Sequence, residues 1–167
     1  MITMNSCTPK VYFTQDIKNR LEQNKVDLKS IQFFNDRKVT LKRELKSGDA
    51  KVSSGKVKFE NGRFINLIIL KPYTPGIIEY KYPEYLTISF EFGLGKTIDF
   101  GKPKNGSMYG AYQILAEKWE NNLGKINYDL QDFYIQPEGA GAKLMIKKSE
   151  LTKINIDKRV IKGRRIN

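Results

Sequence analysis

The alternation of apolar and polar positions predicts short β-strands over most of this chain. The clearest case is segment 85–92, where Leu86, Ile88, Phe90 and Phe92 occupy every second position. Side chains at this spacing point to one face of a strand. Shorter runs of the same character recur along the chain, and we expect strands at 30–34, 38–45, 56–60, 63–70, 77–80, 85–92, 96–100, 109–116, 125–128, 133–135 and 142–148.

Three pairs of these runs have turn residues between them and are expected to form β-hairpins. Asn61-Gly62 separates 56–60 from 63–70 and supplies the two positive-φ residues that a type I′ turn requires. Gly93-Leu94-Gly95 separates 85–92 from 96–100. Asn35-Asp36-Arg37 separates 30–34 from 38–45, and the same reasoning predicts a third hairpin there.

One segment, 14–24, has the spacing of a helix. Thr14 can cap its first turn, Asp16 places a negative charge near that end, and Ile17 and Leu21 form an apolar stripe. Asn24 is a suitable last residue. Residues 1–13, which precede the helix, are expected to be a lead-in outside the core.

Segment 108–119 fits either a strand or a helix of two to three turns, and Tyr109, Gly110 and Tyr112 favour a strand because they begin helices poorly. Many short strands and one helix predict a mainly β fold, a single-domain antiparallel β-sandwich or small barrel with a short N-terminal helix. We expect three parts: residues 1–13 as a tether or lipoprotein-signal remnant, 14–156 as the β domain, and 157–167 as a basic tail.

Composition adds a charge pattern to this picture. The 167 residues carry 30 Lys and Arg against 18 Asp and Glu, a net charge of +12, which attracts polyanions. The last 25 residues hold nine positive and two negative charges, so nine minus two gives +7 of that excess. The nine are candidate contacts for a polyanion: Lys143, Lys147, Lys148, Lys153, Lys158, Arg159, Lys162, Arg164 and Arg165.

The residue types present argue against catalysis. There is no His and a single Cys, which excludes His-based triads, disulfides within the chain and thiolate clusters. Gly93-Leu94-Gly95-Lys96 lacks the spacing of a phosphate loop, and a strand follows it instead of a helix. The carboxylates of the central region, Glu79, Glu84, Glu91 and Asp99, are expected on solvated strand faces, Glu91 among them facing water. We predict no enzyme activity, no cofactor and no metal; two carboxylates facing each other in a deep pocket would argue otherwise.

The N-terminus holds the most specific motif. In bacterial lipoproteins a short motif ends in the Cys that becomes acylated, and small residues precede that Cys. Ser6 before Cys7 fits this motif, whereas Asn5 fits it poorly. Ile2 and Met4 fit the end of an apolar stretch whose start would lie upstream. The alternative is a free cysteine in a disordered terminus.

Three segments also carry a family resemblance: 7–14 (CTPKVYFT), 31–36 (IQFFND) and 158–164 (KRVIKGR). With these segments the chain resembles small uncharacterised lipoproteins of Bacteroidetes-type bacteria over most of its length. The resemblance implies that Cys7 bears the lipid and that the domain is anchored to the outer membrane of the cell envelope. It implies no activity, because no activity is established for that family.

Two functional hypotheses follow. The first is a non-enzymatic envelope lipoprotein, a binding or accessory subunit of a larger membrane-associated assembly, whose basic face meets an acidic protein partner or lipid head groups. The second is a soluble, cytoplasmic basic β domain that binds nucleic acid or another polyanion, for example as a structural part of a phage particle. Tyr80-Lys81-Tyr82 suits the second, although lysines on strands also prevent edge pairing.

Overall fold

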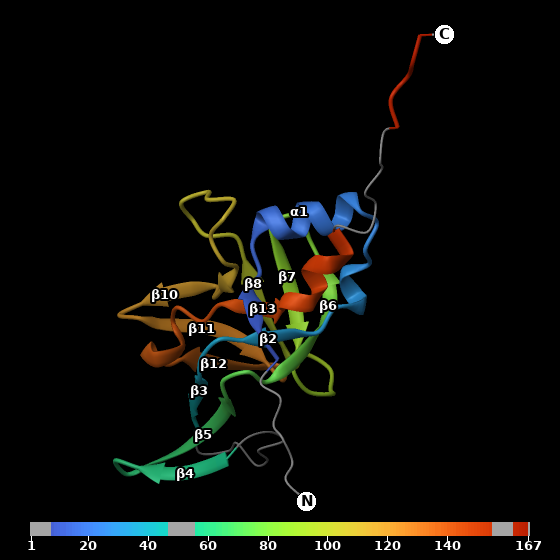
Figure 1. The fold of residues 1–167 in the computed structure, drawn as a ribbon. Coiled ribbons are helices and arrows are strands. Elements are labelled where there is room, and N and C mark those ends of the chain that lie inside the picture. Colours follow the sequence, from blue (N-terminus) through green and yellow to red (C-terminus); the bar gives the residue numbers. More distant parts are fainter. Residues whose placement is uncertain (1–7, 47–55, 155–161, 167) are drawn as a thin grey trace, which may run out of the picture.

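The structure is a computed structural model that describes residues 8–46, 56–154 and 162–166. It contains two antiparallel sheets (Figure 1), which confirms the predicted mainly β fold. The seven-stranded sheet has the order β1-β13-β2-β6-β7-β8-β9 and the six-stranded sheet the order β10-β11-β12-β3-β5-β4. The strands are β1 (Lys10–Tyr12), β2 (Phe33–Asn35), β3 (Val39–Glu44), β4 (Lys56–Glu60), β5 (Arg63–Leu70), β6 (Pro75–Lys81), β7 (Tyr85–Ser89), β8 (Thr97–Gly101), β9 (Gln113–Ile114), β10 (Lys118–Glu120), β11 (Leu123–Tyr128), β12 (Gln131–Ile135) and β13 (Leu144–Lys147).

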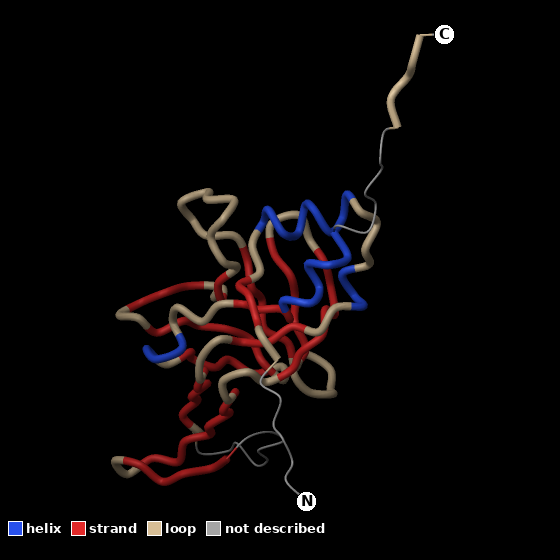
Figure 2. The backbone as a smooth tube through the Cα atoms, viewed as in Figure 1, coloured by secondary structure: helices blue, strands red, loops and turns tan. Residues whose placement is uncertain are grey.

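The helices of the described residues are α1 (Gln15–Gln23) and the 3-10 helices η1 (Leu28–Ser30), η2 (Pro137–Gly139) and η3 (Lys148–Ile154). Helix α1 confirms the prediction, and the Thr14 hydroxyl accepts a hydrogen bond from the amide of Ile17 (3.2 Å). Helices α1 and η3 contact each other, and Figure 2 shows them with η1 beside one end of the seven-stranded sheet. In Figure 1 this helical end lies opposite the end of the domain at which strand β1 begins.

The core lies where the inward faces of the strands meet. Alternate residues of β11, β12 and β13 are buried, as expected for strands with one face on a core, whereas β4 has no buried residue. The largest fully buried side chains are Phe13, Phe33, Phe100, Tyr112 and Phe133. Three of these five come from β2, β8 and β12, so strands distant in sequence build one core.

Residues 10–13, which we expected to lie outside the core, belong to the domain. Strand β1 pairs with β13, and Phe13 is fully buried. The amide of Phe13 donates to the carbonyl of Leu144 (2.9 Å), and its carbonyl accepts from the amide of Tyr112 (2.8 Å). A strand of three residues has too few positions to show alternation, which is why the sequence pattern did not reveal it.

Contacts between its two edges curl the seven-stranded sheet. Isolated bridges join Thr14 to Ala111 and Gln113 to Lys143, so the β9 edge approaches the β1–β13 edge. These are single bridges and not a continuous ladder. In the part of the chain that the structure describes, the sheet is therefore strongly curled without being a closed barrel.

Two of the three predicted hairpins are confirmed. Strands β4 and β5 pair across Asn61 (φ 49°) and Gly62 (φ 77°), both in the left-handed region that a type I′ turn requires. Strands β7 and β8 pair across the segment 90–96. Strands β6, β11, β12 and β13 lie within a few residues of their predicted ranges, β6 beginning earlier, at Pro75.

The prediction of a third hairpin, across Asn35-Asp36-Arg37, is wrong, because β2 and β3 lie in different sheets. Strand β2 pairs with β13 and β6, whereas β3 pairs with β12 and β5. The fully buried side chain of Asn35 explains the crossing. Its amide donates to the carbonyls of Arg37 (2.6 Å) and Lys71 (2.9 Å), and its oxygen accepts from the amide of Thr74 (2.9 Å). Asn35 thus holds a connection between the sheets where its residue type had suggested a tight turn.

Two further ranges need correction. Strand β7 ends at Ser89, so the predicted strand 85–92 is too long, and Phe92 is fully exposed instead of facing the core. Of the predicted strand 109–116 only Gln113–Ile114 is a strand. The chain there is held by bonds outside any strand ladder, such as that from the Gly110 amide to the Ser107 hydroxyl (3.1 Å).

Candidate functional site

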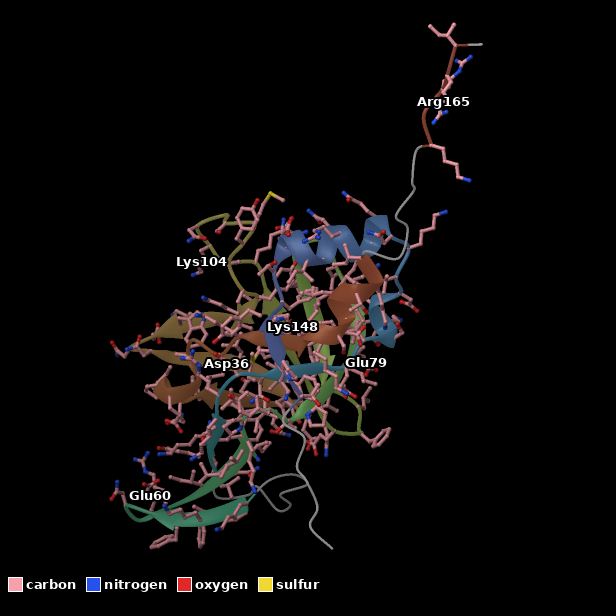
Figure 3. The ribbon with its side chains drawn as sticks, viewed as in Figure 1. Asp36, Glu60, Glu79, Lys104, Lys148 and Arg165 are labelled. Atoms are coloured by element: carbon pink, nitrogen blue, oxygen red, sulfur yellow. The ribbon has the colours of Figure 1, made fainter. Side chains whose placement is uncertain are left out.

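The structure does not gather the predicted polyanion contacts into one cluster. Cys7, Lys158 and Arg159 lie outside the described residues. Lys143 and Lys147 lie in or next to β13, and Lys148 and Lys153 lie on η3. Lys153 forms an ion pair with Glu150 (2.6 Å). Lys162, Arg164 and Arg165 are exposed and lie outside any helix or strand, and Figure 3 shows Arg165 far from Lys148.

Two of these lysines belong instead to a surface made by β1, β13 and β2. Strand pairing places Tyr12 beside Met145 and Met145 beside Phe34, and it places Lys10 beside Lys147. The intervening residues of these strands, such as Leu144 and Ile146, are fully buried, so the paired residues lie on the outer face. We call this surface the basic–aromatic face; it consists of Lys10, Tyr12, Phe34, Tyr73, Lys143, Met145 and Lys147.

Two lysines of the basic–aromatic face, Lys10 and Lys143, lie against its aromatic rings. The Lys10 Nζ atom lies 4.8 Å from the centre of the Phe34 ring and 5.2 Å from that of Tyr73. The Lys143 Nζ atom lies 5.4 Å from the centre of the Tyr12 ring. At these distances the ammonium is attracted to the negative face of the ring. The ring contacts therefore hold these two lysines in place without neutralising their charge.

No ion pair joins Lys10, Lys143 or Lys147 to a carboxylate among the residues that the structure describes. The nearest acid of the face, Asp36, is already engaged by Arg37 (3.1 Å) and by the backbone amide of Lys143 (2.8 Å). The Tyr12 hydroxyl also donates to Asp36 (3.4 Å), and burial followed by the Asp36 charge raises the pKa of Tyr12. The face thus offers positive charge and two exposed tyrosine rings to a partner.

A second surface is apolar and lies where the segment 90–96 meets the β11–β12 turn. Phe92 and Leu94 are 100% and 82% exposed, and Leu130 is 64% exposed. With Ile77 on β6 they form what we call the apolar end. Phe92, Leu94 and Ile77 line a groove of about 640 Å³ on this end. Pro75 and Phe90 also line it, as do the carboxylates of Glu79 and Glu91.

The carboxylates show one departure from expectation. Glu91 is exposed as predicted, and it accepts a hydrogen bond from Tyr128 (2.5 Å). Asp99, which we expected on a solvated face, is half-buried in a groove of about 320 Å³ lined by Tyr85 and Glu117. Its carboxylate accepts a hydrogen bond from Thr87 (2.6 Å). Burial raises the pKa of Asp99, and the Thr87 bond opposes that rise.

The structure places the remaining candidate residues as follows. The segment 93–97 leads into strand β8 and forms a hairpin turn, as expected. Tyr80 and Tyr82 are exposed, but they lie near α1, where Lys81 pairs with Glu22 (3.2 Å), and not on the basic–aromatic face. Within the described ranges no three His, Cys, Asp or Glu side chains are placed to hold a metal ion. None of the helices described has the length and apolar character needed to cross a membrane.

The fold and these surfaces define a small basic β protein of two antiparallel sheets with a short N-terminal helix. Comparison with protein-family models, with curated proteins and with solved structures finds no match. Sequence reasoning missed the basic–aromatic face because its residues come from positions 10–12, 34, 73 and 143–147. Only the alternation of Lys143, Met145 and Lys147 was a signal for it.

Proposed function

We propose that this chain is a non-enzymatic lipoprotein of the bacterial cell envelope. In this proposal acylated Cys7 anchors the β domain to the outer membrane, and the basic–aromatic face binds an acidic surface of a protein partner within a membrane-associated assembly. The resemblance to small lipoproteins supports the anchor. The observation that carries the binding role is the set of three lysines, Lys10, Lys143 and Lys147, none of which has a carboxylate partner in the described part of the chain. Two of them, Lys10 and Lys143, also lie against aromatic rings.

The chemistry of this face suits protein recognition. Tyrosine rings and methionine are enriched in protein interfaces, and charge complementarity steers an acidic partner toward lysines. Lys10 and Lys143 are already placed against rings, so less side-chain entropy is lost when a carboxylate binds them. Tyr12 and Tyr73, 44% and 56% exposed, supply apolar area next to each charge. Such a face binds through charge and ring contacts together.

The anchor is tested by mass spectrometry of the protein isolated from its native membrane. A diacylated or triacylated Cys7 at the mature N-terminus supports the proposal. An intact Met1 with an unmodified Cys7 contradicts it. The variant Cys7→Ser should leave the membrane fraction.

The binding role is tested by chemical cross-linking in cells followed by purification in mild detergent. A partner that is cross-linked by the wild type should be lost from the triple variant Lys10→Glu, Lys143→Glu, Lys147→Glu. The matched control is Lys25→Glu, Lys29→Glu, Lys104→Glu, which changes the net charge equally at three exposed lysines away from the face. Equal cross-linking by both triple variants would count against the face.

The second candidate function, binding of single-stranded nucleic acid, draws on the same face, because lysines beside exposed rings also suit stacked bases. It predicts a complex whose affinity falls steeply with salt concentration. Fluorescence anisotropy with labelled single-stranded DNA and RNA at low salt measures this directly. The absence of any shift at low salt argues against this function and leaves the protein-binding role.

A further inference from the structure

The apolar end exposes large side chains on turns that are held in place. The amide of Asp129 donates to the carbonyl of Gly95 (2.9 Å), which joins the two turns. Gly95 has φ of 72°, and a Cβ there would lie 3.1 Å from Leu130 Cδ2, so the Leu130 side chain packs directly on the turn. Phe92 and Leu94 are therefore displayed on a supported turn.

Next to these turns the ion pair of Glu91 with Lys96 (3.8 Å) and the hydrogen bond from Tyr128 to Glu91 connect the segment 90–96 to β11. Polar contacts thus support the base of the turn while its tip carries Phe92 and Leu94. A partner that takes up the tip meets apolar side chains without having to break these contacts.

The chain also enters the domain at this end. Strand β1 begins at Lys10, whose ammonium lies 5.2 Å from the ring centre of Tyr73, and Tyr73 belongs to the turn between β5 and β6. In Figure 1 this turn and the segment 90–96 lie at the end opposite α1. Strand β6 links them, because Pro75 and Ile77 line the same groove as Phe92.

The distance from Cys7 to the domain is short. Residues 10–13 belong to the domain, so only Thr8 and Pro9 separate Cys7 from β1. Each residue spans at most about 3.6 Å, which places Cys7 within about 11 Å of Lys10. An acyl chain on Cys7 would hold this end of the domain against the bilayer, and this step rests on the proposed function.

We infer that the apolar end docks on the bilayer, with Phe92 and Leu94 inserted at the boundary between head groups and acyl chains. The exposed side chain of Lys71 lies beside this end and can meet anionic lipid head groups. Lys96 is paired with Glu91 (3.8 Å), and Glu79 and Glu91 also line the groove, so charge contributes little to the docking. The exposed apolar side chains of Phe92 and Leu94 therefore supply most of the expected binding, as in surfaces that bury apolar residues at the boundary between head groups and acyl chains. Docking fixes the orientation of the domain, so the basic–aromatic face rises from the membrane along β1 and β13.

The test uses the full chain with Cys7→Ser, so that binding does not depend on the anchor. This background contains no other cysteine, and a fluorophore sensitive to polarity is attached at Leu94→Cys. Vesicles of phosphatidylcholine and phosphatidylglycerol in equal parts should shift its emission to the blue. The matched control carries the fluorophore at Tyr109→Cys, a 79% exposed site in the loop beside α1, and its emission should not shift.

Sedimentation with the same vesicles gives the second readout. Replacing Phe92 and Leu94 by Asn should lower the partition coefficient about tenfold or more, since two large apolar side chains no longer enter the lipid. Replacing Met108 and Tyr109 by Asn should leave it unchanged. Because all four side chains are exposed, the variants should keep the wild-type circular dichroism and unfolding curve.

The outcomes separate the two proposals. Equal partition of both double variants, or equal fluorescence shifts at both sites, overturns the docking inference even if Cys7 proves to be acylated. An unmodified Cys7 together with vesicle binding that requires Phe92 and Leu94 overturns the anchor and retains the docking surface. A dimer in light scattering that dissociates in the Phe92/Leu94 variant would show that a second copy covers this end, and it would overturn docking on lipid.

Discussion

Replacing Phe13 by alanine should lower the free energy of unfolding by about 3–5 kcal/mol, the range for a buried phenylalanine. Phe13 is 0% exposed and lies where the β1–β13 edge approaches residues 111–114. The centre of its ring lies 5.1 Å from that of Phe33 and 5.2 Å from that of Tyr112. The ring planes meet at 82° and 79°, so both pairs pack edge-to-face. The substitution therefore removes apolar burial and two ring pairs at once.

The magnitude comes from three contributions. Burying a phenylalanine side chain contributes up to about 3 kcal/mol, and each aromatic pair adds about 0.5–1.5 kcal/mol. The cavity left between Phe33 and Tyr112 adds to the loss because rings in a packed core relax only partly. For a chain of this size such a loss should lower the melting temperature by about 6–20 °C.

The assay is urea unfolding followed by circular dichroism, with Tyr12→Ala as the control in the neighbouring position. Tyr12 is 44% exposed and bonds weakly to Asp36 (3.4 Å), so its loss should cost about 1 kcal/mol or less. Equal, small losses in the two variants would refute the placement of residues 10–13 in the domain. A tether of thirteen residues would then replace the short connection on which membrane docking depends.

Substitutions at three further positions test local features. Thr14→Ala should cost about 1 kcal/mol, measured by thermal unfolding, and Thr14→Ser should restore most of it, because the hydroxyl accepts from the Ile17 amide. Gly62→Ala should cost about 1 kcal/mol, since φ there is +77° while a Cβ would meet no atom within 4 Å; an unchanged unfolding midpoint would contradict the type I′ turn. Asp99→Asn keeps the acceptor for Thr87 and removes a charge whose burial raises the pKa. Because the folded protein binds that proton more tightly, wild-type stability falls as pH rises from the ordinary value of 3.8 through the higher folded pKa. The variant should therefore be the more stable protein at neutral pH, with an advantage that shrinks below that window; a constant difference across pH would contradict the burial of Asp99.

The candidate surfaces differ in how far the sequence could predict them. The candidates Cys7 and the C-terminal charges could be proposed from neighbouring residues alone, and both stay predictions. The basic–aromatic face depends on strand pairing, which joins position 10 to 147 and position 12 to 145. Single-sequence alternation shows which residues share a face of one strand, but it cannot show which strands are neighbours. Met145 therefore comes to lie between Tyr12 and Phe34 only in the folded chain.

What the sequence by itself determined was local. The Thr14 cap, the Asn61-Gly62 turn and the alternation in β7 and β8 each follow from conformational preferences over a few residues, and each agrees with the structure. The absence of His is likewise a fact of the sequence that no fold can change.

Tertiary structure decided the rest, because buried polar groups and core rings must find partners at a distance. Asn35 has the residue type of a turn, but its buried amide bonds to Lys71 and Thr74, and the chain crosses between sheets there. Phe92 continues the apolar alternation of β7, yet the turn after Ser89 carries it into solvent. Phe13 lies in a segment before the helix that has no pattern of its own. The rings of Phe33 and Tyr112 pack on it, and its backbone is hydrogen-bonded to Leu144 and Tyr112, so it belongs to the core.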